Sequence, residues 1–326
     1  AVMGDLCRHA HQGRYQQCTI DFIKDTCGAD ISDYQETDQA PGNALAQQTA
    51  MLRTNWRSKD SPGIGELARA VNDENLPQVR KAFQKYGDSL HRHPLRSDDR
   101  QLETLLLNGS GNQEGLRALF QTVATPPSQR QDFDAWAAGL LKQLTLQQLL
   151  SGLRSGPFGV EQLNQRITRH LQQQDLAPER EWYPGRPVMM TRNDYQLGLM
   201  NGDVGLTLPL LEEKKQEERN GKPELLLRVA FQLPDGRIKW VLPSRLDGVE
   251  TVYAMTVHKS QGSEFRHTLL VLPDAPHPLL TRELIYTAVT RARDRFTLLE
   301  FGKPAVLDSA VKKRTWRASG LAERLM

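Results

Sequence analysis

Two stretches decide the fold: Thr256–Phe265, which reads Thr-Val-His-Lys-Ser-Gln-Gly-Ser-Glu-Phe, and Leu284–Arg293, which reads Leu-Ile-Tyr-Thr-Ala-Val-Thr-Arg-Ala-Arg. Between them, Thr268–Leu272 is an apolar run of the length of a buried strand. We therefore predict a polar turn, a core strand and then a helix with arginines at its C-terminal end. A further strand follows at Phe296–Phe301. Strands alternating with helices in this way predict an α/β fold.

The same alternation precedes these stretches. Leu146–Leu153 predicts a strand, Arg154–Gly159 a turn, and the apolar stripe that begins at Val160 a helix. Loops at the C-terminal ends of such strands are where α/β proteins bind ligands. Gly156–Gly159 is therefore either a backbone contact to a phosphate or a purely structural turn.

Short strands with tight turns interrupt this pattern after Trp182. Asn201-Gly202 and Pro234-Asp-Gly236 are strong turn signals. The predicted strands cover Arg186–Arg192, Val204–Leu208, Leu225–Leu233 and Ile238–Leu242. Several short strands inside an α/β chain predict a small inserted β-barrel. The charged run Glu212–Lys222 is expected to be a solvated loop tip.

The first third of the chain carries fewer signals. Residues 1–50 hold few large apolar residues, and Thr26–Asn43 is typical of a loop. Gly63–Ala68 matches a dinucleotide-binding fingerprint, but it follows a charged turn instead of a core strand, so we reject that function and expect a helix entry. His91 and His93 are expected to be solvated loop residues.

Chain length, net charge and the lengths of apolar runs further limit the possible fold and partners. A chain of 326 residues predicts two or three packed units, and a formal charge of +3 permits an anionic partner without requiring one. No apolar run approaches the roughly 18 residues of a membrane span, so we expect no membrane partner. Position 1 is not methionine, which suggests a piece of a longer chain.

The three cysteines, Cys7, Cys18 and Cys27, are widely spaced. This spacing favours reduced thiols and a cytoplasmic location over a disulfide framework. A zinc site with His9 and His11 would be the alternative, but structural zinc usually has paired ligands about two to four residues apart. We therefore expect no metal site here.

Arg291 continues the apolar stripe of Leu284 and Ala288 at helical spacing, whereas Arg293 falls on nearly the opposite face. A buried arginine must find an anionic partner. That partner is either a carboxylate of this chain or the γ-phosphate of a nucleotide, in which case Arg291 would be an arginine finger. The residues alone leave both open.

The polar stretch Thr256–Phe265 makes a poor core segment. Its hydroxyls, amides and lysine suit phosphate oxygens of a nucleic-acid backbone, while Glu264 could accept hydrogen bonds from a ribose or fix a neighbouring loop. Capping and turn formation are the alternative role.

The sequence lacks a Gly-x-x-x-x-Gly-Lys-Ser/Thr phosphate loop, since Gly221-Lys222 and Gly302-Lys303 are both followed by proline. It also lacks a strand ending in an Asp-Glu pair suited to Mg²⁺. The chain alone is therefore predicted not to hold a triphosphate, and to be inactive as an ATPase.

At these residues the chain resembles superfamily 1 DNA helicases, and most closely the RecD group, the alpha subunits of bacterial exodeoxyribonuclease V. Ala254–Phe265 looks like motif V of that family, Leu284–Arg293 like motif VI and Leu52–Arg57 like motif IV. Further segments that resemble RecD are Gly156–Asn164, Arg186–Asp194 and Asn201–Gly205.

The resemblance implies the C-terminal half of a split motor whose phosphate loop and Mg²⁺ carboxylates lie in a first RecA-like domain. Residues 1–50 would be a linker or helical remainder of that first domain. Residues 51–184 and 251–326 would form a second RecA-like domain with a parallel sheet, and residues 185–250 an inserted SH3-like β-barrel. ATP with Mg²⁺ would be bound mainly by the first domain.

The resemblance also assigns roles to residues. Arg57 and Arg291 would reach the γ-phosphate as catalytic residues, and Gly262 and Glu264 would lie towards the ATP. The DNA-binding residues would be Thr256, His258, Lys259 and Ser260.

The implied function is that of an ATP-dependent 5′–3′ DNA helicase subunit in double-strand break repair and recombination. Its implied partners are single-stranded DNA and RecB-like and RecC-like subunits. The alternative is a non-catalytic module that binds single-stranded DNA or assembles subunits.

Overall fold

The computed structural model describes residues 7, 10–42, 44–51, 61–96, 100–110, 113–212, 224–302 and 304–315. The chain divides into two compact units, residues 60–313 and a smaller unit of residues 1–59 with 314–326. The described helices of the smaller unit are α2 Gln17–Cys27, η1 Ser32–Tyr34 and η2 Ala46–Gln48. Cys7, Cys18 and Cys27 carry free thiols.

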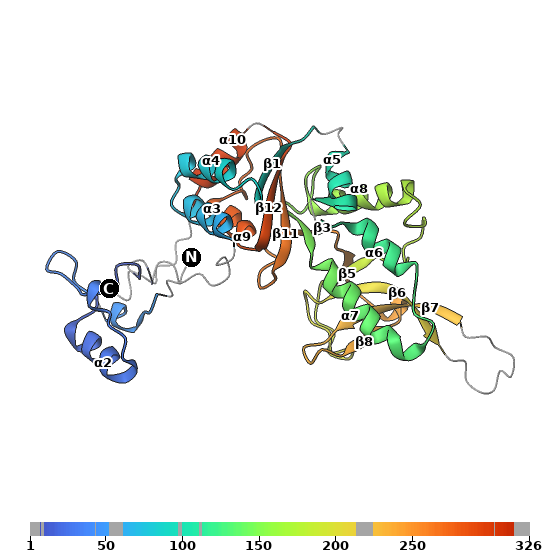
Figure 1. Cartoon of the computed structure of the whole chain (residues 1–326), viewed down its shortest axis with the longest axis horizontal. Helices are drawn as coiled ribbons and strands as arrows, with labels where there is room; N and C mark the ends of the chain where they lie inside the picture. Colours follow the sequence, from blue (N-terminus) through green and yellow to red (C-terminus); the bar gives the residue numbers. More distant parts are fainter. Residues whose placement is uncertain are drawn as a thin grey trace. The chain divides into compact units, whose positions relative to one another are not determined.

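A five-stranded parallel sheet organises the larger unit, with the strand order β1-β12-β11-β4-β10. Figure 1 labels its strands β1, β12 and β11, which lie side by side. Its strands are β1 Leu90–Pro94, β4 Gln147–Ser151, β10 Ala254–Thr256, β11 Phe265–Leu272 and β12 Ala292–Glu300. The central strand β11 is buried over His267–Leu272. Such continuous burial is typical of a parallel sheet covered on both faces.

Helices cover both faces of this sheet, as Figure 1 shows. One group packs around Leu270 and Leu298: α3 Pro62–Asn72, α4 Leu76–Lys85, α9 Arg282–Val289 and α10 Ala305–Lys312. The other packs around Leu149 and Leu269: α5 Gln101–Asn108, α6 Leu116–Val123, α7 Phe133–Leu144 and α8 Val160–Gln173. A short hairpin, β2 Gly109–Ser110 with β3 Gln113–Glu114, and the turn η3 Arg130–Asp132 lie between helices of the second group.

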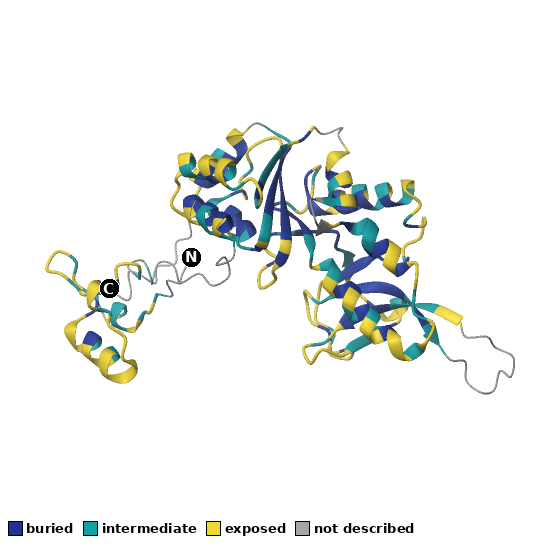
Figure 2. Ribbon diagram, viewed as in Figure 1, coloured by how far each residue is buried: buried dark blue, intermediate teal, exposed yellow. Residues whose placement is uncertain are grey.

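A second, antiparallel sheet has the order β8-β7-β6-β5-β9. Its strands are β5 Pro187–Met190, β6 Val204–Glu212, β7 Glu224–Gln232, β8 Ile238–Val241 and β9 Val249–Thr251, with η4 Pro243–Arg245 before β9. Val188, Met190 and Phe231 belong to an apolar cluster of its own. Figure 2 shows buried stretches along the strands of this sheet. Only Val252 and Tyr253 separate β9 from β10, so the two sheets are joined directly at that point.

The predicted α/β fold with a parallel sheet is confirmed, as are the strand at Thr268–Leu272 and the helix from Val160. Two predicted bounds are wrong. The helix predicted over Leu284–Arg293 ends at Val289, and the strand predicted over Phe296–Phe301 begins at Ala292. The arginines lie outside the helix because the chain turns at Arg291 to enter the sheet.

His91 and His93 are not loop residues as expected. Both lie on β1, where His91 pairs in register with Thr297 and His93 with Leu299 of β12. Burial, with neighbouring Arg295 and His93, lowers the pKa of His91. The sequence did not predict this strand because most of its side chains are polar and no apolar pattern indicates it.

No helix among the described residues is long and apolar enough to cross a membrane. Within the same residues, no three His, Cys, Asp or Glu side chains gather closely enough to hold a metal ion.

Candidate functional site

The loop 257–264 connects the C-terminal end of β10 to the N-terminal end of β11. Its first residue is tied to the sheet, because the Val257 amide donates to the Ser151 carbonyl of β4 at 3.0 Å. Ser260 is fully buried, and its hydroxyl donates to the Val257 carbonyl at 2.8 Å. This placement favours a turn-forming role for Ser260 within the predicted DNA-binding set.

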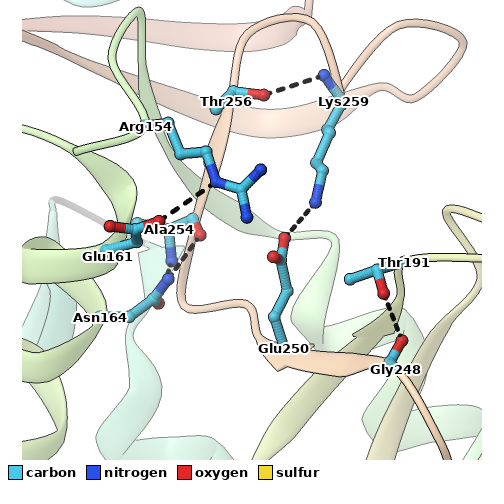
Figure 3. Close-up of polar contacts among 9 residues, drawn as sticks. All are labelled: Arg154, Glu161, Asn164, Thr191, Gly248, Glu250, Ala254, Thr256 and Lys259. Atoms are coloured by element: carbon cyan, nitrogen blue, oxygen red, sulfur yellow. Dashed lines mark hydrogen bonds and ion pairs between the residues drawn. The ribbon is translucent and has the colours of Figure 1, made fainter.

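The first end of the loop carries the remaining predicted DNA contacts. The Thr256 hydroxyl, at the end of β10, accepts a hydrogen bond from the Lys259 amide at 3.3 Å. His258 is exposed. The Lys259 ammonium forms an ion pair with Glu250 of β9, and Figure 3 shows the lysine side chain extended towards that carboxylate. Three polar side chains thus gather where the two sheets join.

The second end of the loop carries the residues predicted to lie towards the nucleotide. Gly262 is exposed, with a positive φ of 90° and open space around the position of a Cβ. Glu264 is exposed as well. Because φ near 90° is strained for any residue with a Cβ, a glycine fits the bend at this point.

Arg291 joins the two sequence stretches at this end. Its side chain is buried, with 9% exposed. The guanidinium donates to the Ser263 carbonyl at 3.0 Å, the Thr287 carbonyl at 3.2 Å and the Thr290 hydroxyl at 3.4 Å. The Phe265 amide in turn donates to the Arg291 carbonyl at 2.9 Å. Arg291 therefore fixes the end of α9 to the end of the loop.

Arg57, the other predicted catalytic residue, lies in residues 52–60, outside the described residues. The motif IV segment Leu52–Arg57 lies there too. Its meeting with Arg291 stays a prediction.

The loop after β4 lies beside the first end of loop 257–264, since β4 and β10 are paired neighbours. Ser151 at the end of β4 stabilises it: the hydroxyl donates to the Phe158 carbonyl at 2.7 Å and accepts from the Leu153 amide at 3.0 Å. A Cβ on Gly159 would lie 2.4 Å from the Ser155 carbonyl oxygen. The glycine is therefore required by close packing, which favours the structural role for this turn.

Sequence reasoning assigned no individual role to four polar residues here, Arg154, Glu161, Asn164 and Glu250. Arg154 pairs with Glu161 of α8 at 3.1 Å, and Glu250 pairs with Lys259 (Figure 3). Asn164 of α8 is buried, and its side chain exchanges two hydrogen bonds with the backbone of Ala254, at 3.0 and 2.8 Å. An asparagine between the apolar positions Leu163 and Ile167 was the one available signal, since a buried amide needs partners.

One buried histidine lies on β11, the strand that follows the loop. His267 of β11 is 1% exposed, and its Nε2 lies 2.7 Å from the Thr297 hydroxyl. Burial lowers the pKa of His267 to about 3, and the neighbouring Arg295, His91 and His93 act in the same direction. The imidazole is therefore neutral at neutral pH.

Comparison with known proteins bears on this site. A family described as the UvrD-like helicase C-terminal domain matches residues 251–299, which contain both sequence stretches and Arg291. The RecBCD enzyme subunit RecD of Haemophilus influenzae is 29% identical over 100% of this chain and 47% of its own length. The chain resembles RecD along its whole length. The predicted resemblance is thus confirmed.

Other relatives match over shorter parts. The ATP-dependent RecD2 DNA helicase of Deinococcus radiodurans is 35% identical over 55% of this chain and 23% of its own length. A crystal structure of Pif1 helicase from Bacteroides with ADP-AlF3 and ssDNA has a TM-score of 0.41 at 14% identity, covering 84% of this chain and 55% of that chain. The chain spans about half the length of the Haemophilus RecD.

Proposed function

We propose that this chain is the C-terminal motor portion of a RecD-like, ATP-dependent DNA helicase subunit that moves 5′ to 3′ and acts in double-strand break repair and recombination. One observation carries the proposal: the Arg291 guanidinium is fixed to Ser263 at one end of a loop whose other end presents Thr256, His258 and Lys259. A single loop thus connects a candidate nucleotide contact with candidate DNA contacts.

At the nucleotide end, Arg291 acts as the arginine finger, with Arg57 as a second cation and Gly262 and Glu264 beside the ATP. Preorganised positive charge stabilises the γ-phosphoryl group as it is transferred. The backbone carbonyls of Thr287 and Ser263 orient the Arg291 guanidinium. The phosphate loop and the Mg²⁺ ligands come from a first RecA-like domain.

At the DNA end, Thr256, His258 and Lys259 contact the phosphates of single-stranded DNA without reading sequence. Ser260 holds the turn. The antiparallel sheet β5–β9 belongs to an SH3-like barrel beside these contacts, and the partners of the whole motor are RecB-like and RecC-like subunits.

The test needs the chain fused behind the phosphate-loop domain expected of the RecD group. Arg291→Ala is expected to lower DNA-stimulated ATPase by about three to five orders of magnitude, the usual contribution of an arginine finger. Arg293→Ala is the matched control, because Arg293 is exposed on β12.

Full ATPase activity in Arg291→Ala would remove the arginine-finger role of this residue. Salt-sensitive oligonucleotide binding by a fused protein that shows no DNA-stimulated ATPase would favour the alternative, a non-catalytic module that binds single-stranded DNA. Unwinding of a 5′-tailed but not a 3′-tailed duplex checks the proposed direction.

A further inference from the structure

The Lys259–Glu250 ion pair lies at the junction of the two sheets. Glu250 is on β9, opposite Met189 of β5, and Lys259 is two residues beyond Val257, whose amide is bonded to β4. The side chains of Lys259 and Glu250 are 35% and 30% exposed. The pair is thus reached by solvent, on an edge proposed to carry DNA phosphates.

A second cation of the same edge is matched in the same way. Arg154 follows β4 and pairs with Glu161 at 3.1 Å, with the side chains 76% and 52% exposed (Figure 3). Each of these two cations therefore has a carboxylate partner within the chain. A solvent-exposed pair contributes little to stability, so either pair can open at a small cost in free energy.

We propose that Glu250 is an intramolecular competitor of single-stranded DNA for Lys259. This inference rests on the proposed function, because it takes the Lys259 contact with a phosphate as given. A lysine ammonium is a compact charge with three rotatable donors on a flexible stem, so it exchanges one oxygen partner for another without rebuilding the backbone. The Lys259 amide stays on the Thr256 hydroxyl, which keeps the loop in place during that exchange.

Competition weakens binding without removing the contact. A phosphate that takes Lys259 must displace Glu250, whose freed carboxylate then faces the incoming negative charge. Glu250 therefore sets the affinity and the salt dependence of this contact. A motor that steps along a strand needs such contacts to release readily.

The test measures binding of a fluorescent oligothymidylate to the 326-residue chain over a range of salt concentrations. Glu250→Gln is expected to tighten binding about two- to fivefold, the change that corresponds to an exposed ion pair. Lys259→Ala is expected to weaken binding and to reduce the slope of log K against log salt by about 0.7, the value of one phosphate contact on a single strand. In the double variant the gain from Glu250→Gln must vanish.

Asp235→Asn is the matched control for charge. It removes one carboxylate from an ion pair with Arg237 in the β7–β8 turn, and β8 is the edge strand opposite β9 in the same sheet. It is expected to leave affinity unchanged. An equal gain in Asp235→Asn would reduce the effect to net charge and overturn the inference.

The outcomes separate this inference from the proposed function. If Lys259→Ala weakens binding while Glu250→Gln changes nothing, competition is wrong and the DNA contact stands. If neither variant changes binding, the Lys259 contact itself fails. Weaker binding in Glu250→Gln would mean that the pair holds the loop in its binding shape, which also overturns competition. Glu250→Thr, whose side chain suits a strand, repeats the test should the glutamine variant fold poorly.

Discussion

The loop 257–264 is held in two different ways at its two ends. At the second end, the buried Arg291 donates to fixed backbone carbonyls of Ser263 and Thr287. At the first end, the half-exposed Lys259 binds the side-chain carboxylate of Glu250. Backbone carbonyls cannot move away from their partner, whereas a carboxylate on a surface strand can. One end is therefore built for orientation and the other for exchange.

The largest effect on stability is expected at the second end. Arg291→Ala removes three hydrogen bonds and leaves two carbonyl groups to find water, so we expect the free energy of unfolding to fall by about 2–4 kcal/mol. Arg293→Ala, at an exposed position, should change it by at most about 0.5 kcal/mol. Urea unfolding of the chain measures both. Equal effects of the two variants would break the distinction between the ends.

Strand β11, which follows the second end of the loop, makes stability depend on pH through His267. The unfolded histidine titrates near 6.5 and the folded one near a pKa of about 3, so between these values the unfolded state binds one more proton. Stability is full above pH 6.5 and falls as the pH is lowered, by about 2 kcal/mol at pH 5. The burial of His91 adds to the loss in the same direction.

Thermal unfolding at pH 7 and pH 5 checks this expectation, with His267→Gln as the control. The variant should lose part of the pH dependence, because glutamine does not titrate. A wild-type profile that is flat over this range would show that His267 has no lowered pKa.

The parts predicted from sequence share one property: their signal is local. Thr268–Leu272 is an unbroken apolar run and is buried along its whole length in β11. The α8 stripe recurs at helical spacing, and Val160, Leu163 and Ile167 are buried accordingly. Local patterns of this kind follow from the faces that a strand or helix must bury.

The features that the sequence did not predict depend on partners that are distant in the chain. β1 contains His91, Arg92 and His93, and it is a strand because it pairs with β12, where Glu300 accepts two hydrogen bonds from Arg92 at 2.8 Å. The Glu250–Lys259 pair arises from the turn between β9 and β10, which no spacing rule indicates. The carbonyl partners of Arg291 are backbone atoms, and a sequence carries no pattern for them.

Gly262 forms the bend at the second end of the loop, and its substitution should have an intermediate effect. Gly262→Ala places a Cβ at φ 90° in open space, so only backbone strain of about 1–2 kcal/mol is expected. Gly139→Ala is the control of opposite sign: Gly139 lies within α7 with open space around it, and alanine should stabilise that helix by about 0.5–1 kcal/mol. A neutral Gly262→Ala, measured by the urea midpoint, would mean that the loop relaxes freely between its ends.

The smallest effect is expected at the first end. Glu250→Gln breaks a half-exposed ion pair, and such pairs contribute about 0.2–1 kcal/mol, so the free energy of unfolding should change by no more than this. Glu300→Gln is the matched contrast, because Glu300 is 6% exposed and its loss leaves Arg92 without its carboxylate, at an expected cost of about 2 kcal/mol or more. If Glu250→Gln destabilised the chain as much as Glu300→Gln, the first end would be as firmly fixed as the second. The carboxylate on β9 would then be a structural support, and exchange of Lys259 onto a phosphate would require part of the antiparallel sheet to open.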